Sequence, residues 1–385
     1  MRNGWRIFDV DRHVHEPLDL WKDYLPQKFH GFLPTLAYLD RGEPLSERMT
    51  APGPDGPIAL PPDLLVDGQP VMNISKSAKI EIAAAATQRP GDLALGENAS
   101  GHLNAMDQTG IDGALLLPSF AGYLVAMPHR DHQVAAAYAD AYNHWLADLC
   151  SADPKRLNGA AIIARYDPAE MIQQARFALE HGWKAVVIRP NPIAGRLLGD
   201  EEDAPFWTFC AENGLRVVVH EAAHARTDTA GADRFSSRFA QHACSHPMEQ
   251  MMAFLSLLES GTFERLPDLR VAFLEAGAGW MVHWLWRLDE LEYAHLANEV
   301  RHAIKRRPSE YFRNQCAIGF EPGEPFLGET ITYLGETRLM FGSDFPHLDH
   351  DEDIVGSALS MALSEDRLRG MLGANAEHFF GFPAD

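Results

Sequence analysis

Residues 8–17 read FDVDRHVHEP and place acids and imidazoles on alternate positions of a strand-like segment. Side chains two residues apart project to the same face of a β-strand, so His13 and His15 are expected to point the same way. Imidazole nitrogens are ligands for Zn²⁺, Fe²⁺ and similar ions. The pair therefore favours a metal site. The alternative for this motif alone is a polar strand end that faces solvent.

Three further apolar runs end in an ionisable residue. RVVVH ends in His220, VAFLE ends in Glu275, and LMFGSD ends in Asp344. Each of them alone fits an ordinary polar strand terminus. In a parallel barrel, however, all these ends would meet at one rim. Three histidines and an aspartate would there form a nitrogen and oxygen ligand set with a position left for water or substrate.

The order of the apolar runs indicates the fold class. Eight short β-branched or leucine-rich runs alternate with longer, mostly amphipathic segments, and this alternation predicts βαβ units with a parallel sheet. Eight units favour a closed (β/α)₈ barrel of the TIM type, in the α/β class, over an open doubly wound sheet. No GxGxxG turn follows the first run, which argues against dinucleotide binding. The runs cover residues 7–13, 113–118, 159–163, 185–190, 216–221, 271–277, 315–320 and 339–346.

Residues 27–100 fit no barrel unit. They include the proline- and glycine-rich stretch APGPDGPIALPPDLL and the helix-like stretch SKSAKIEIAAAATQ. An insertion after the first strand would lie over the carboxyl-terminal mouth, where barrel active sites are found. We therefore expect it to form a lid, a wall of the pocket or a dimer contact. The alternative is a surface excursion with no role. Residues 1–385 are predicted to form a single domain that contains this insertion.

Composition limits the possible partners. The chain has 385 residues, of which 46% are apolar and 23% charged, which is the balance of a globular protein with a sizeable core. A net charge of −21 argues against nucleic acid and anionic membrane as partners, but not against a small anionic substrate. The four cysteines are far apart and predict reduced thiols. With no apparent signal peptide or membrane-spanning run, a cytoplasmic location is expected.

The order DRHVHEP, VVVHEAA, FLEAGAGW and FGSDFPH resembles the amidohydrolase-related (amidohydrolase 2) group, over most of the chain. This group includes aminocarboxymuconate-semialdehyde decarboxylase and resorcylate decarboxylases. The resemblance implies a (β/α)₈ barrel with one divalent metal ion, zinc being the expected ion and manganese or iron the alternatives. It implies His13, His15, His220 and Asp344 as the ligands. Dimers are common in the group, so a homodimer is expected.

Two positions qualify the resemblance. The best-known decarboxylases of the group carry a histidine at the end of strand six, where this chain has Glu275. A carboxylate can still take or give a proton, although its charge and reach differ from those of imidazole. Glu16 follows the two histidines and is a further candidate metal ligand. Its alternative role is a salt bridge or a cap near Pro17.

Other residues near the predicted rim are candidates for substrate binding. Arg189 ends the run AVVIR and could clamp a carboxylate, with Asn191 as a hydrogen-bond donor beside it. His224 and His347 follow two of the strand ends, and Trp280 could form an apolar wall for an aromatic ring. The alternatives are a structural ion pair for Arg189, ordinary surface or buried histidines, and core packing for Trp280.

These expectations lead to a metal-dependent enzyme of the amidohydrolase superfamily. Non-oxidative decarboxylation of a small aromatic or unsaturated carboxylate is the leading hypothesis, with Asp344, Glu275 and His220 as the catalytic residues. The first alternative is hydrolysis of a C–N, C–O or C–C bond in a small cyclic compound, since this barrel supports both reactions. The second is a barrel that binds a ligand without turnover. A small carboxylate is the expected partner, with neither nucleic acid nor membrane involved.

Overall fold

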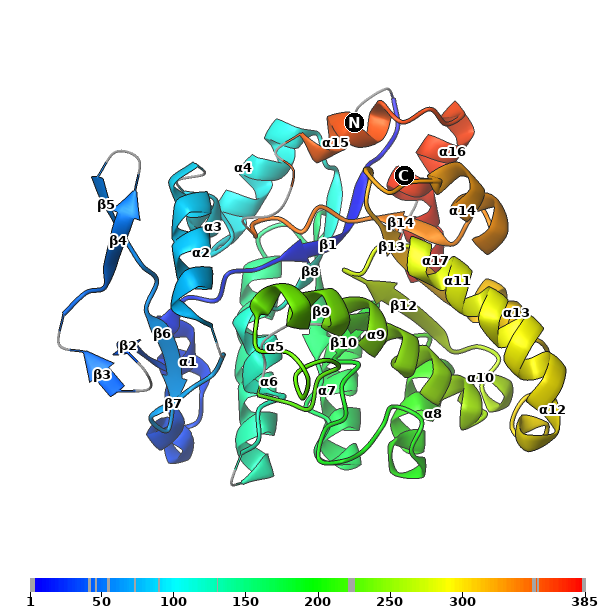
Figure 1. Cartoon of the computed structure of the whole chain (residues 1–385), viewed down its shortest axis with the longest axis horizontal. Helices are drawn as coiled ribbons and strands as arrows, with labels where there is room; N and C mark the ends of the chain where they lie inside the picture. Colours follow the sequence, from blue (N-terminus) through cyan, green and yellow to red (C-terminus); the bar gives the residue numbers. More distant parts are fainter. Residues whose placement is uncertain are drawn as a thin grey trace.

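The computed structural model describes residues 4–40, 43–45, 47–53, 56–72, 74–88, 91–129, 131–220, 226–347, 351 and 353–382. Eight parallel strands form one sheet, and they follow one another in sequence order (Figure 1). Burial on both faces explains the mostly apolar sequences of the strands other than β1, which has the sequence FDVDRH. The strands are β1 (Phe8–His13), β8 (Gly113–Leu117), β9 (Leu157–Ile162), β10 (Ala185–Ile188), β11 (Arg216–His220), β12 (Arg270–Leu274), β13 (Cys316–Phe320) and β14 (Leu339–Phe341).

The last strand returns to the first and brings the two ends of the chain together. A parallel bridge joins Arg12 to Phe345, and the backbone N–H of His13 donates to the carbonyl oxygen of Phe345 at 2.7 Å. The N–H of Asp344 also donates to the carbonyl oxygen of Asp11 at 2.8 Å. The predicted (β/α)₈ barrel is therefore confirmed.

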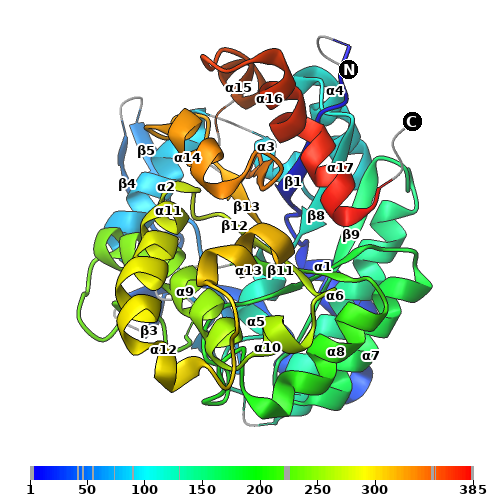
Figure 2. The ribbon, with the colours of Figure 1, turned by 90° about the vertical axis from the view of Figure 1, so that its right-hand side faces the viewer.

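Helices surround the strands, as Figure 2 shows. Their apolar faces pack on the barrel, and the buried side chains of helices and strands form one large hydrophobic core. The longer helices are α4 (Ala99–Thr109), α6 (His132–Cys150), α7 (Pro168–Glu180), α8 (Ala204–Glu212), α9 (Arg238–Glu259), α11 (Gly279–Arg287), α13 (Pro308–Gln315) and α14 (Leu327–Leu334). Among the described residues, no helix combines the length and apolar character required to cross a membrane.

Short helices complete the loops and the carboxyl-terminal region. Two of them, η1 and η2, are 3₁₀ helices, and two, η3 and η4, are π-helices. They are α1 (Leu18–Tyr24), η1 (Gln27–Phe32), α5 (Phe120–Leu124), η2 (Glu201–Asp203), α10 (Thr262–Arg265), η3 (Leu288–Tyr293), α12 (Ala294–Val300), α15 (Ile354–Leu359), α16 (Glu365–Arg369), η4 (Gly370–Ala374) and α17 (Asn375–Phe380).

Residues 27–100 form structure of their own between β1 and β8. A four-stranded antiparallel sheet has the order β3-β2-β6-β7, and β4 pairs with β5 (Figure 1). The helix-like stretch noted above is helix α2. These elements are β2 (Thr35–Asp40), β3 (Glu43–Leu45), β4 (Thr50–Gly53), β5 (Gly56–Ala59), β6 (Asp63–Val66), β7 (Gln69–Pro70), α2 (Lys76–Gln88) and α3 (Asp92–Leu95).

Gly342, directly after β14, allows the end of that strand to approach β1. A Cβ atom at this position would collide with the Cβ of Asp11. We expect Gly342→Ala to lower the free energy of unfolding by about 1–3 kcal/mol, because neither backbone can move away without disturbing the barrel closure. Thermal unfolding measures the effect. Gly328→Ala on α14 is the control, since its new methyl group would meet only the side chain of Leu363, at an ordinary contact distance. Equal melting temperatures for the two variants would contradict the prediction.

Candidate metal centre

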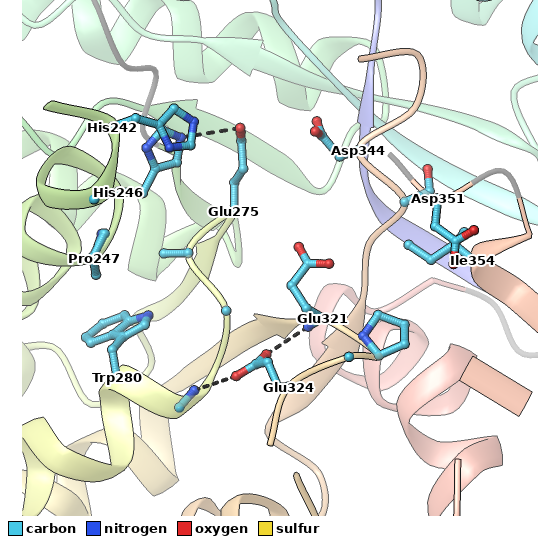
Figure 3. Close-up of a pocket in the computed structure, with 17 residues that line it drawn as sticks. His242, His246, Pro247, Glu275, Trp280, Glu321, Glu324, Asp344, Asp351 and Ile354 are labelled. Carbon is cyan, nitrogen blue, oxygen red and sulfur yellow. Dashed lines mark hydrogen bonds and ion pairs between the residues drawn. The ribbon is translucent and has the colours of Figure 1, made fainter. Parts of the chain in front are cut away.

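A pocket of about 620 Å³ opens at the carboxyl ends of β12, β13 and β14 (Figure 3). Glu275, Glu321 and Asp344 enter it from the loops that follow these three strands. Helix α9 contributes His246, and helix α11 contributes Trp280. The pocket therefore lies where active sites of (β/α)₈ barrels are found, and it combines ionisable groups with an aromatic wall.

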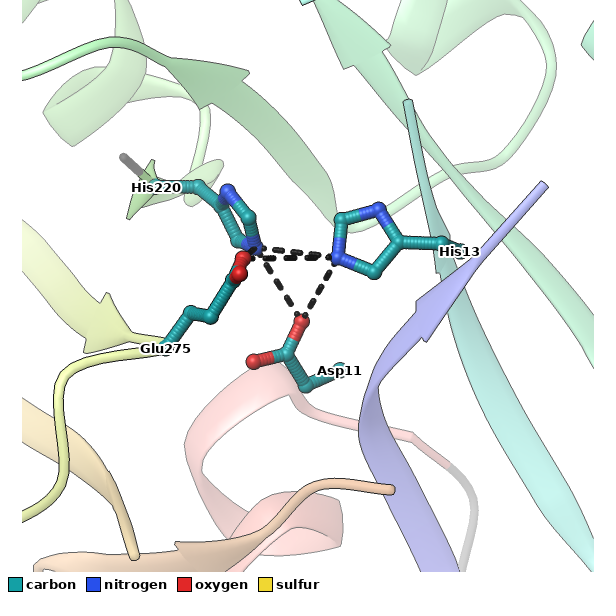
Figure 4. Close-up of side chains that lie close together, drawn as sticks. All are labelled: Asp11, His13, His220 and Glu275. Carbon is teal, nitrogen blue, oxygen red and sulfur yellow. Dashed lines mark hydrogen bonds and ion pairs between the residues drawn. The ribbon is translucent and has the colours of Figure 1, made fainter. Parts of the chain in front are cut away.

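Four side chains converge beside this pocket, as Figure 4 shows. Asp11 and His13 come from β1, His220 ends β11, and Glu275 follows β12; one ligand atom of each lies within 4.8 Å of all the others. The Nε2 atoms of His13 and His220 are 3.1 Å apart. Oδ1 of Asp11 is 3.2 Å from Nε2 of His220, and Oε2 of Glu275 is 2.5 Å from it.

The hydrogen bonding of His13 decides what this cluster can bind. Nδ1 of His13 lies 2.8 Å from the carbonyl oxygen of Pro118, which can only accept, so Nδ1 carries a proton. In the neutral ring, Nε2 then presents a lone pair to His220, Asp11 and Glu275. Two Nε2–H groups that face each other across 3.1 Å would repel, whereas a cation could be bound by the lone pairs of both nitrogens. Two nitrogens and two carboxylates that share one point are a fitting ligand set for a divalent cation.

The electrostatics of the cluster express the same need for positive charge. Burial alone would lower the pKa of His13, yet Asp11 and Glu275 hold it well above its usual value. Burial opposes the charged form of His220 too, but Glu275 and Asp11 raise its pKa to about 9. Burial would raise the pKa of Glu275, but the charge of His220 and the hydrogen bonds from His13 and His220 hold it well below its usual value.

Asp344 lies at the edge of this cluster. Its Oδ1 is 3.5 Å from Nε2 of His13 and accepts a hydrogen bond of 2.7 Å from Nδ1 of His347. The other ring nitrogen of His347 lies 2.9 Å from Oγ of Ser119, and the ring stacks on His13 with centroids 4.2 Å apart. His13, Asp344 and His347 form a second group of possible ligand atoms. Burial raises the pKa of Asp344, although His347 offsets part of that effect.

The backbone at two of these carboxylates is unusual. Glu275 has φ of 57° and Asp344 has φ of 53°, in the left-handed region that residues with a Cβ rarely occupy. Such conformations cost free energy and persist only when the surrounding structure enforces them. Here the strand ends of β12 and β14 carry the strain and turn both carboxylates toward the cluster.

His15 and Glu16 were expected to be metal ligands, but neither side chain belongs to the cluster of Asp11, His13, His220 and Glu275. Strand β1 ends at His13, so the alternation that would place His15 beside it stops there. Nδ1 of His15 is instead 3.4 Å from Oε1 of Glu97, and its ring is 5.1 Å from that of Phe120. The structure does not bring His15 into the cluster. The second side chain that β1 contributes, beside His13, is Asp11.

Glu16 has the capping role that was its alternative. Its two carboxylate oxygens accept hydrogen bonds from the backbone N–H groups of Ser119, Phe120 and Ala121, at 2.8–3.0 Å. These three groups begin helix α5 and have no partner within that helix. Because both oxygens are engaged there, Glu16 supports the loop after β8 and does not contribute to the cluster.

The expected substrate-binding residues are dispersed. Nε and Nη2 of Arg189 donate to Oδ1 of Asn191 at 3.1 and 2.9 Å, and both side chains are buried. The guanidinium lies 5.8 Å from the ring centroid of Tyr123, and neither Arg189 nor Asn191 lines the pocket described above. Trp280 does line it. His224 falls outside the described residues.

Three residues of the site were not selected from the sequence, namely Asp11, His246 and Glu321, the last of which directly follows the apolar run of β13. Asp11 lies on the alternating motif itself, but an acid before a histidine pair is weaker evidence than the pair. His246 lies on helix α9, and its Nε2 is 3.5 Å from Oε1 of Glu275. One signal for it was its place four residues after His242, which puts both rings on one face of a helix. The two rings stack with centroids 4.2 Å apart.

Comparison with known proteins assigns the chain to a family. A family model described as Amidohydrolase matches residues 10–382. The chain belongs to the amidohydrolase family. The resemblance inferred from the sequence is thereby confirmed, as is the prediction of an enzyme, a carboxy-lyase or hydrolase of the amidohydrolase superfamily.

Individual relatives are similar to this chain in sequence or in fold. The 2-amino-3-carboxymuconate-6-semialdehyde decarboxylase of Dictyostelium discoideum is 26% identical over 254 residues, which are 65% of this chain and 68% of the relative. An amidohydrolase from Mycobacterium avium subsp. paratuberculosis matches with a TM-score of 0.74 at 22% identity, over 98% of the present chain and 100% of the Mycobacterium chain. A 5-carboxyvanillate decarboxylase from Novosphingobium aromaticivorans, complexed with manganese and 4-hydroxy-3-methoxy-5-nitrobenzoic acid, matches with a TM-score of 0.70 at 20% identity, over 99% and 97% of the two chains.

Proposed function

We propose that this amidohydrolase is a metal-dependent, non-oxidative decarboxylase of a small aromatic or unsaturated carboxylate. The observation that carries the proposal is the convergence of Asp11, His13, His220 and Glu275 beside the pocket at the barrel mouth. The reaction type is supported by the decarboxylases among the relatives.

The same four residues would hold one divalent ion, and Asp344 lies at the edge of their cluster. A bound ion would supply positive charge for the carboxylate end of the substrate. Zinc is the ion expected from the sequence. Manganese suits two or three carboxylate ligands equally well, and a relative of the same fold carries it.

The reaction breaks the bond between the carboxylate carbon and the ring or alkene carbon. Its electron pair stays on the ring or alkene carbon, which takes a proton as CO₂ leaves. We assign that proton to Asp344, because burial raises its pKa and His347 fixes Oδ1 at 2.7 Å. Glu275 has its pKa held well below the usual value, so it is better suited to remain ionised as a ligand.

Other parts of the proposal depend on the sequence. A cytoplasmic location fits the four cysteines, all of which are free and three of which are buried. A homodimer is carried over from the resemblance to the group. We also retain residues 27–100 as a lid or dimer contact within one domain.

Release of CO₂ tests the proposal directly. Purified protein is stripped of metal with a chelator, reloaded with zinc, manganese or iron, and incubated with a panel of benzoic and unsaturated carboxylic acids. We expect CO₂ equal to the acid consumed, and a loss of about 100-fold or more in rate without metal. Absence of CO₂ from every acid, together with turnover of amides or lactones, would establish the hydrolase alternative instead.

A further inference from the structure

The charges that line the pocket do not favour a simple anion. Its described lining residues include no lysine and no arginine. The acidic residues are Glu275, Glu321, Glu324, Asp344 and Asp351, against the imidazoles of His242 and His246. A divalent ion held by Asp11 and Glu275 would be neutralised by these two carboxylates alone. The remaining pocket would still repel a substrate whose only polar group is a carboxylate.

Most of these carboxylates already have partners. Oε1 of Glu324 accepts from the backbone N–H groups of Glu321 and Ala278, and Oε2 accepts from Ala278 and Gly279, at 2.8–2.9 Å. Asp351 accepts from Oγ of Ser357 at 2.6 Å. Glu275 and Asp344 belong to the two groups of possible metal ligands. These four acids are therefore committed to loop structure or to the metal centre.

Glu321 is different. It directly follows β13, and its backbone N–H is fixed by Glu324, so the position of the residue is well defined. Its carboxylate projects into the pocket (Figure 3) and has no hydrogen bond or ion pair to any described residue. Glu321 is exposed to solvent, yet partial desolvation in the pocket and the charges of Asp11 and Asp344 raise its pKa to about 7. A proton donor beside this carboxylate would relieve the unfavourable charge that these neighbours impose.

We propose that Glu321 selects substrates that carry a hydroxyl or amino group, by accepting a hydrogen bond from that group inside the pocket. This inference rests on the proposed function, because the carboxylate end of the substrate is taken to lie at the metal centre. The donor group then reaches the opposite, acidic side of the pocket. Glu321 is in this sense a specificity-determining residue, and it is not a metal ligand.

Binding of ligands that cannot decarboxylate separates this proposal from the reaction itself. The manganese-loaded protein is titrated by calorimetry with benzenesulfonate and with its hydroxy and amino derivatives in all three ring positions. We expect at least one derivative to bind more tightly than benzenesulfonate. Glu321→Leu should remove that advantage, a loss of about ten- to hundredfold, which is typical for a hydrogen bond to a charged group. Binding of benzenesulfonate itself should not weaken, because Glu321→Leu removes a negative charge that repels this anion.

Two further variants make the test specific. Glu321→Gln keeps an accepting oxygen and should restore part of the advantage that Glu321→Leu removes. Glu329→Leu makes the same substitution at an exposed position of α14 outside the pocket and should leave all affinities unchanged. The proposal is overturned if no derivative binds better than benzenesulfonate, or if the advantage survives in Glu321→Leu. Failure to release CO₂ would instead refute the decarboxylase and leave these affinities as they are.

Discussion

His13→Ala is expected to remove the metal and, with it, the activity. Nε2 of His13 lies within 3.6 Å of ligand atoms of Asp11, His220 and Glu275, so its loss opens the centre of the cluster. We expect metal content to fall from about one ion per chain to below about 0.1. The rate of CO₂ release should fall by about 1,000-fold or more, since the ion that holds the substrate is lost. Elemental analysis of the purified protein measures the first effect, and a CO₂ assay measures the second.

His15→Ala is the matched control for this experiment. It removes the same side chain two residues further along, but the ring of His15 lies beside Glu97 and Phe120. We expect the metal content of this variant to equal that of the parent protein. If His15→Ala lost its metal and His13→Ala retained it, His15 would be the ligand and His13 would not, which would contradict the assignment.

Most of the barrel could be predicted because its strands are buried on both faces. That burial demands short continuous apolar runs, and the parallel arrangement demands a long connection between them. The rim followed from the same logic. His220, Glu275 and Asp344 each stand where an apolar run stops, and the fold brings those ends to one mouth.

The details of β1 could not be predicted from the period of a strand. The register with β8 shifts between Asp9 and Arg12, and the strand ends at His13. Alternation therefore pairs Asp11 with His13 and leaves His15 outside. The capping role of Glu16 depends on helix α5, which lies more than 100 residues along the chain. No local pattern can indicate such a contact.

The place of Arg189 shows a similar limit. A cation at the end of a strand suggested a carboxylate clamp, but its direction depends on neighbours from other segments. The structure turns it toward Asn191 and Tyr123. His246 reaches Glu275 from helix α9, which covers the barrel from outside its strands. Contributions from helices of this kind have no strand-end signal.

Glu275→Gln is expected to weaken the metal centre and to slow the reaction even when metal is restored. From the sequence, Glu275 was expected to be a catalytic residue and was not among the expected metal ligands. The structure places Oε2 of Glu275 2.5 Å from Nε2 of His220 and 3.6 Å from Nε2 of His13. A neutral amide there removes one negative charge from the ligand set. We expect metal affinity, measured by competition with a chelator, to fall by about 10- to 100-fold or more.

Turnover at saturating metal then separates the two roles of Glu275. If it is mainly a ligand, most of the lost CO₂ release should return once the site is filled, and a residual defect of about tenfold would reflect altered charge. If it is the acid, a defect of about 100- to 10,000-fold should persist at full occupancy. Because Glu275 has its pKa held well below the usual value, we expect the first result. Glu299→Gln, which removes an exposed carboxylate on α12, is the control and should change neither quantity. Unchanged metal affinity with a persistent loss of turnover would make Glu275 the proton donor and release Asp344 from that role.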